Sequence, residues 1–153
     1  MPHNINLFCH SSFYLTFDLF KWIRRMNKEV LNAISKDILG AAISVHKEMG
    51  PGLLESVYQQ CLAKELFLRE IKLQTMVPVA LQYKGHTLNK DYVIDILVED
   101  EIIIELKAVE TILPVHEAQI ISYLKLADKR LGFLINFNVP LLKDGFRRFV
   151  NNF

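Results

Sequence analysis

Residues 91–107 read DYVIDILVEDEIIIELK, and this stretch decides how the chain folds. Two apolar, β-branched runs flank an acidic patch, which is typical of a β-hairpin with its turn at that patch. Each run is apolar at successive positions, so the hairpin should lie inside a sheet that is covered on both faces. Three charged residues interrupt the runs: Asp95, Glu105 and Lys107. Because a buried charge is costly unless it is paired or binds a metal, these residues mark a candidate site.

The length of the hairpin loop decides whether the three charges meet. Glu105 and Lys107 are two positions apart on one strand and therefore share a face. A two-residue turn would place Ile94 opposite Glu105 and turn Asp95 away, whereas a three-residue loop over 99–101, or a bulge, would bring both carboxylates together. Converging carboxylates beside an ammonium group would suit Mg²⁺ or Mn²⁺. The alternative is a buried ion pair between Lys107 and one carboxylate.

Length and composition predict one globular domain. The 153 residues are 51% hydrophobic and 23% charged, which is enough for a substantial core and excludes a disordered chain. The net charge of +1 provides no general basic field, so any contact with nucleic acid must come from local patches. Cys9 and Cys61 form neither a metal-binding spacing nor a disulfide framework. They indicate a reducing cellular interior, and we expect the protein in the cytoplasm.

The first 25 residues differ from the rest of the chain. They are apolar and aromatic, but their basic residues follow the apolar stretch instead of preceding it as in a signal peptide. Polar residues within the stretch disfavour a transmembrane helix, so we expect no stable membrane association. We interpret residues 1–25 as an upstream extension from a wrongly chosen start codon, dispensable for stability, with Met26 as the biological start and 26–153 as one domain. The alternative is a native helix or peripheral membrane anchor.

Two helices are expected before the sheet. Apolar residues recur at helical spacing over 27–49, and Gly50 and Pro51 end that helix. A second helix should run from about Leu53 to Arg69. Its predicted core face consists of Leu54, Val57, Cys61, Leu62 and Leu66.

The start of the second helix reads GLLESVY, and Gly52, Glu55 and Tyr58 resemble the signature that names the GxxExxY protein family. The resemblance extends over nearly all of 26–153. Glu55 and Tyr58 lie on one face of the helix, and we expect that face to point towards Asp95. Without a role in a site, Glu55 would be a first-turn acid stabilised by the helix dipole, and Tyr58 a half-buried aromatic residue.

The order of elements after the second helix predicts a mixed α/β sandwich. We expect strands at 72–77 and 79–83 around Pro78, a turn at 84–86, the hairpin, a helix from Pro114 to about Lys129, a strand at 131–137, a turn at 143–145 and a strand at 146–150. This order agrees with the αβββαβ core of the PD-(D/E)XK nuclease superfamily, and Asp95 followed by Glu-x-Lys at 105–107 resembles its active site. The proline of the superfamily name is absent, because Ile94 precedes Asp95.

The helix after the hairpin carries a second motif. Gln119 and Tyr123 are four residues apart and face the same way. They resemble the Gln-x-x-x-Tyr element of RecB-like and Cas4-like nucleases within the superfamily, and they follow Glu-x-Lys in the same order. The alternative is a surface glutamine and a core tyrosine.

The resemblance implies a metal-dependent nuclease that hydrolyses phosphodiester bonds, with DNA expected as substrate before RNA. Asp95 and Glu105 would hold Mg²⁺ or Mn²⁺, with the Leu106 carbonyl as a further ligand, and Lys107 would orient water or offset charge on the phosphate. Glu55 would add a carboxylate. Gln119 and Tyr123 would position the phosphate or the lysine.

A second interpretation is a catalytically silent module with a nuclease fold, which binds nucleic acid or a protein partner. The near-neutral charge favours this interpretation, whereas the presence of all three charged residues, Asp95, Glu105 and Lys107, argues against it.

Overall fold

A computed structural model describes residues 26–153, so the predicted extension over 1–25 lies outside the described residues. Along the chain the elements are α2 (Lys28–Met49), α3 (Glu55–Leu68), β1 (Leu73–Tyr83), β2 (His86–Val98), β3 (Ile102–Lys107), α4 (Pro114–Leu126), β4 (Leu131–Asn136), α5 (Leu142–Gly145) and β5 (Phe146–Val150). The predicted order of helices and strands is confirmed with two exceptions: β1 is one strand instead of two, and the short helix α5 replaces the predicted turn at 143–145. No helix in this described part is long and apolar enough to cross a membrane.

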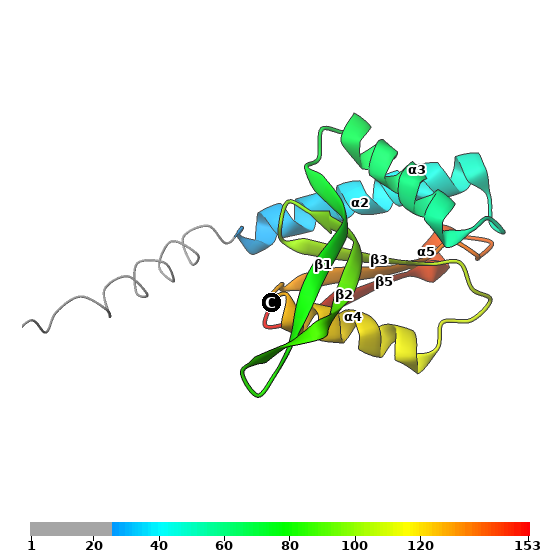
Figure 1. Ribbon diagram of the computed structural model, residues 1–153. Coiled ribbons are helices and arrows are strands. Elements are labelled where there is room, and N and C mark those ends of the chain that lie inside the picture. The colour runs from blue at the N-terminus through cyan, green and yellow to red at the C-terminus, as the bar shows by residue number, and fades with distance from the viewer. Residues whose placement is uncertain (1–25) are drawn as a thin grey trace, which may run out of the picture.

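The five strands form one mixed sheet in the order β1-β2-β3-β4-β5. Strands β3 and β4 are parallel, and the other neighbours are antiparallel. The parallel pair needs a crossover connection, and α4 supplies it. Helices α2 and α3 cover one face of the sheet, and α4 covers the other (Figure 1).

Strand β3 is buried on both faces, as its continuous apolar run predicts. Ile102, Ile104 and Leu106 pack on the side of α2 and α3, whereas Ile103 packs on the side of α4. Because side chains alternate along a strand, the charged positions two and four residues after Ile103 also lie on the α4 side. This alternation places the charges of Glu-x-Lys beneath the first turns of α4.

The hairpin has the three-residue loop, which resolves the question of register. Val98 pairs with Ile102, and Ile96 pairs with Ile104. The loop between the strands is therefore 99–101. The pairing ends at Ile96 and Ile104, one position before Asp95 and Glu105, so the register has the parity that the convergence of the two carboxylates requires.

The fold explains why two expectations for local structure were wrong. Strand β1 runs without a break through Pro78, which pairs with Val93. The strand lies at the edge of the sheet, where one side is free and a residue without an N–H group is tolerated. Leu54 does not join the core, because α3 begins after it and leaves its side chain exposed. The buried face of α3 is formed by Tyr58, Leu62 and Leu66.

Candidate functional site

A buried ion pair lies at the carboxyl end of β3. Glu105 is 2% exposed and Lys107 is 9% exposed. The Lys107 ammonium donates to Glu105 Oε1 at 2.9 Å and to the Leu106 carbonyl at 3.0 Å. The ion pair expected as the alternative to a metal site is therefore present, and it occupies one of the two Glu105 oxygens.

Asp95 lies where β2 separates from β3. The pairing between these strands ends at Ile96 and Ile104. Beyond that point the Leu106 N–H donates to Asp95 Oδ2 at 2.8 Å. The carboxylate thus takes the place of a backbone acceptor, and this bond fixes its position beside Glu105.

The backbone around Asp95 is supported from two neighbouring elements. On β1, Met76 has a left-handed backbone with φ of 54°, and it interrupts the pairing between Thr75↔Ile96 and Val77↔Ile94. From α3, Gln59 Nε2 donates to the Asp95 carbonyl at 2.9 Å and to the Met76 sulfur at 3.1 Å. Gln59 was missed by the sequence analysis. Its only signal was its position one turn after Glu55, on the same face of the helix.

Helix α4 contributes the predicted glutamine and tyrosine. Gln119 Nε2 donates to Glu105 Oε1 and to the Tyr123 hydroxyl, both at 2.9 Å. The Tyr123 ring is nearly buried, and its centroid is 4.9 Å from that of Tyr92 on β2. Gln119 therefore links the buried carboxylate to Tyr123 and, through it, to the hairpin.

The two motif residues of α3 have different surroundings. Glu55 Oε1 is 4.0 Å from the Lys107 ammonium, which is itself 2.9 Å from Glu105 Oε1. The sum of these distances, about 6.9 Å, is the upper limit for the separation of the two carboxylate oxygens. Tyr58 instead donates its hydroxyl to the Gly50 carbonyl at 2.6 Å and accepts the Leu53 N–H at 3.1 Å.

Tyr58 is therefore part of the core and of the loop that precedes α3. Its ring is fully buried and stacks on Phe137 with centroids 4.5 Å apart. The expectation that its side chain points towards Asp95 together with Glu55 was wrong. The signature residues divide into one acid beside Lys107 and one tyrosine that holds the loop closed.

Burial raises the pKa values of the carboxyl groups in this cluster. Burial raises the pKa of Glu105 to about 7, the nearby Asp95 charge adds to the effect, and the Lys107 ammonium opposes it. Burial also raises the pKa of Asp95, against the Leu106 N–H and Lys107, and that of Glu55, against Lys107. Burial alone would lower the pKa of Lys107, but the surrounding carboxylates outweigh it and raise that pKa. The cluster holds more negative charge than its single ammonium neutralises.

The donor set fits a small divalent cation. Glu105 Oε2 is buried and has no hydrogen-bond partner, which is costly for a carboxylate oxygen unless a cation or water reaches it. Asp95 supplies a second hard oxygen beside it. Within 26–153 no three acidic, histidine or cysteine side chains are grouped closely enough to hold a metal ion together, so Glu55 is not a third ligand here. Two carboxylates suffice for Mg²⁺, which keeps several of its waters.

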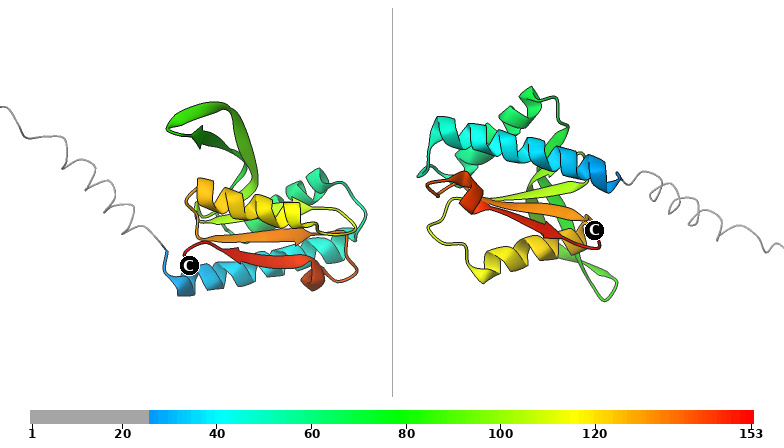
Figure 2. Two further views of the ribbon diagram at one scale, coloured as in Figure 1. Left: turned by 90° about the horizontal axis from the view of Figure 1, so that it is seen from below. Right: turned by 180° about the vertical axis from the view of Figure 1, so that it is seen from behind.

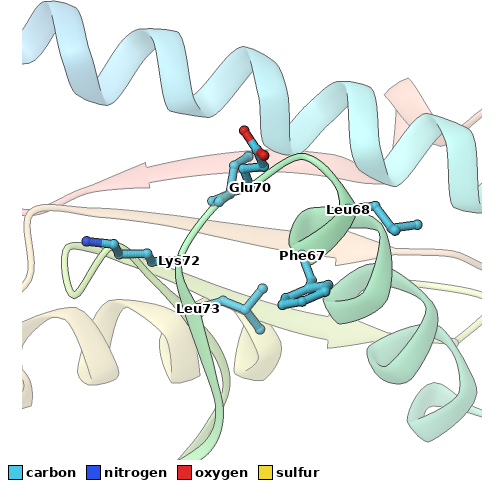
Figure 3. Close-up of a pocket in the computed structure, with 6 residues that line it drawn as sticks. Phe67, Leu68, Glu70, Lys72 and Leu73 are labelled. Carbon is cyan, nitrogen blue, oxygen red and sulfur yellow. The ribbon is translucent and has the colours of Figure 1, made fainter.

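A cavity of about 560 Å³ lies at a different place, between the end of α3 and the start of β1 (Figure 3). Its lining residues are Phe67, Leu68, Glu70, Ile71, Lys72 and Leu73. None of the charged cluster is among them. The cavity is therefore separate from the candidate site.

Comparison with protein families gives one match. The model described as the PD-(D/E)XK nuclease superfamily matches residues 32–149, which includes the hairpin, the charged cluster and α4. Neither the comparison with curated proteins nor that with solved structures gave a match.

Proposed function

The chain belongs to the PD-(D/E)XK nuclease superfamily, and on that premise we propose that it is a metal-dependent nuclease of the GxxExxY type, acting on DNA. The observation that carries the proposal is Glu105 Oε2, a buried carboxylate oxygen without a partner. It lies next to Asp95, whose charge helps to raise the pKa of Glu105. A divalent cation would satisfy that oxygen and remove the repulsion between the carboxylates.

Asp95 and Glu105 would hold Mg²⁺ or Mn²⁺. The Leu106 carbonyl is a third donor, although it already accepts from Lys107, so both of its lone pairs would be used. A bound cation supplies a Lewis acid that polarises a phosphate oxygen and lowers the pKa of a water molecule.

The other residues prepare this pocket for a phosphodiester. Lys107 places a positive charge where negative charge builds up on the phosphate oxygens during hydrolysis. Gln119 donates to Glu105 Oε1, so Glu105 Oε2 would be the oxygen that binds the cation. Glu55 adds a half-exposed carboxylate beside Lys107 and, with a raised pKa, can bind a proton near the reacting groups.

The GxxExxY assignment is supported by the different roles of its motif residues. Gly50 and Gly52 have left-handed backbones with φ of 67° and 96°. Tyr58 ties this loop down, and Glu55 then begins α3 at the site. The signature thus describes a loop that delivers one carboxylate to Lys107.

A binding module without turnover is the second candidate. The observation that favours it is the pair of bonds from Lys107 to Glu105 and to the Leu106 carbonyl, which pairs the ammonium with one carboxylate without a metal. In that case the cluster would be a structural ion network.

Thermal melting with Mg²⁺, Mn²⁺ or EDTA, together with cleavage of plasmid and oligonucleotide DNA, separates the two candidates. The nuclease proposal predicts that metal raises the melting temperature. At a metal concentration 100 times the dissociation constant, the free energy of unfolding should rise by roughly 2.7 kcal/mol. Asp95→Asn and Glu105→Gln should abolish this effect and cleavage. The exposed α2 variant Glu48→Gln, whose acid lies outside the cluster, is the matched control and should keep both.

An absence of both metal stabilisation and cleavage in the native protein would favour the binding module. Equal metal stabilisation in the native protein and in both carboxylate variants would place the metal elsewhere and contradict the proposed site.

A further inference from the structure

The hairpin of β1 and β2 continues far beyond the sheet. Strand β2 pairs with β3 only over 96–98, whereas its pairing with β1 continues to Tyr83↔His86. The outer part, residues 79–92, is therefore a two-stranded ribbon without a third strand, and we call it the β-arm. It extends past α4 and beyond the rest of the sheet (Figures 1 and 2). Its two-residue turn has left-handed Lys84 and Gly85, with φ of 48° and 80°, which fits the twist of a tight hairpin.

One face of the β-arm carries aromatic and apolar side chains and a histidine. Val77 and Val79 of β1 pack on the side of α4, and alternation along β1 places Leu81 and Tyr83 on that side too. Tyr92 pairs with Val79 and shares the same side. His86 pairs directly with Tyr83 and also shares that side. The arm face therefore consists of Leu81, Tyr83, His86 and Tyr92, of which Tyr83, His86 and Tyr92 are exposed. The pairing register shifts between Ala80 and Gln82, and Lys90 lies opposite that shift.

The arm face begins at the candidate site. Tyr92 contacts Tyr123, whose hydroxyl accepts from Gln119, and Gln119 also donates to Glu105. Along β1 the face continues outward from Val79, the partner of Tyr92, to Tyr83 for roughly 13 Å at about 3.3 Å per residue. A chain molecule lying along this face would have one end at the charged cluster.

The chemistry of the face fits exposed bases linked by phosphates. The Tyr83 ring is 62% exposed at the tip, and the Lys84 ammonium lies 5.4 Å from its centroid. Lys84 and Lys90 are opposed by a single acid within the β-arm, Asp91. Tyrosine rings stack on bases of any sequence, and neighbouring lysines attract the phosphates between them.

We propose that the β-arm binds single-stranded nucleic acid and leads it to the carboxylate cluster, an inference that rests on the proposed nuclease function. Stacking needs bases that are not already stacked and paired, as in a single strand. A duplex would offer mainly phosphates, and a chain of net charge +1 with two lysines on the β-arm lacks the charge to bind many of them.

The test compares binding and cleavage in the full chain with the tip variant Tyr83→Ala. Binding is measured by fluorescence anisotropy of a labelled 12-nucleotide single-stranded DNA, with Ca²⁺ in place of Mg²⁺ to limit cleavage. Loss of one stacking contact should weaken binding by roughly 5- to 150-fold. Tyr83→Phe keeps the ring and should bind as the native protein does. Phe67→Ala, which removes a similarly exposed aromatic ring from α3, is the matched control and should also bind normally.

Hydrolysis of a small ester, bis(p-nitrophenyl) phosphate, separates the β-arm from the site. The native protein and Tyr83→Ala should hydrolyse it equally, because it is too small to reach the β-arm from the cluster. Weaker DNA binding by Tyr83→Ala supports the role of the β-arm whether or not a substrate is cleaved. An absence of cleavage by the native protein would count against the proposed nuclease function and not against the β-arm. Native-like binding by Tyr83→Ala, or equal weakening of binding to a duplex of the same sequence, would overturn the proposal.

Discussion

Replacement of Glu105 by glutamine should remove a pH-dependent loss of stability. Burial and the neighbouring Asp95 raise the pKa of Glu105 from 4.5 to about 7, although Lys107 opposes the shift. The folded protein therefore keeps this proton up to about pH 7, whereas the unfolded chain releases it near its ordinary pKa. Since the folded state binds more protons between these two values, the free energy of unfolding falls as pH rises through this interval and is constant above it.

The magnitude follows from the size of the shift. Each pKa unit corresponds to about 1.36 kcal/mol, so the full effect is about 3 kcal/mol, of which roughly 2 to 3 kcal/mol falls between pH 5 and 8.5. Glu105→Gln cannot ionise, and its amide oxygen can still accept from Lys107 and Gln119. We expect the variant to lose less stability over this range than the native protein, by about that amount. If Glu105 and Lys107 formed an ordinary buried ion pair, Glu105→Gln would instead lower the free energy of unfolding at pH 8, because the Lys107 charge would lose its partner.

Urea unfolding followed by circular dichroism in EDTA, at half-unit steps from pH 5 to 8.5, measures the difference. Glu48→Gln, an exposed carboxylate on α2, should reproduce the native pH dependence. Added Mg²⁺ should reduce the native loss above pH 7, because a cation favours the ionised carboxylate. Parallel curves for the native protein and Glu105→Gln would refute the reasoning, since Glu105 would then have no raised pKa in the folded state.

Three further changes test individual contacts. Lys107→Ala should reduce cleavage by about 100-fold or more while metal still raises the melting temperature; loss of the metal effect would show that the lysine is needed for metal binding. Gln59→Ala should raise the dissociation constant for Mn²⁺ by about tenfold, because Asp95 loses its support from α3. Calorimetry measures this constant, and Gln60→Ala, a change at the exposed neighbouring residue, should bind Mn²⁺ normally. Tyr58→Phe should lower stability by about 1 to 2 kcal/mol in urea unfolding without changing cleavage, and a loss of activity at unchanged stability would contradict its structural role.

The local pattern predicted the sheet and the hairpin because these depend on alternation and loop length. The apolar run of β3 required burial on both faces, and a three-residue loop was the length expected to bring Asp95 and Glu105 together. Pro78 suggested a break in β1, since the sequence does not show which strand lies at the edge. Leu54 was assigned to the core because the predicted helix began at about Leu53, two residues before α3 does.

Local sequence patterns did not predict the contacts between elements that are distant in the sequence. Gln59 supports Asp95 across 36 positions of sequence, and its place one turn after Glu55 does not identify that partner. The left-handed backbone of Met76 is equally hidden, because methionine has no preference for it. Tyr58 was assigned to the site from its shared face with Glu55, but its hydroxyl is used by the loop before α3. The spacing of residues along a helix predicts which side chains share a face, but it does not predict the residue that each side chain contacts.

The most direct test of a metal-dependent site is a crystal structure of the native protein grown with Mn²⁺, with the ion located by its anomalous scattering. We expect one ion between Asp95 and Glu105, bound to Glu105 Oε2, at about 2.0–2.2 Å from both carboxylates as is usual for small divalent cations. An ion bound elsewhere, or no ion at millimolar Mn²⁺ with the Lys107 ion pair unchanged, would contradict it.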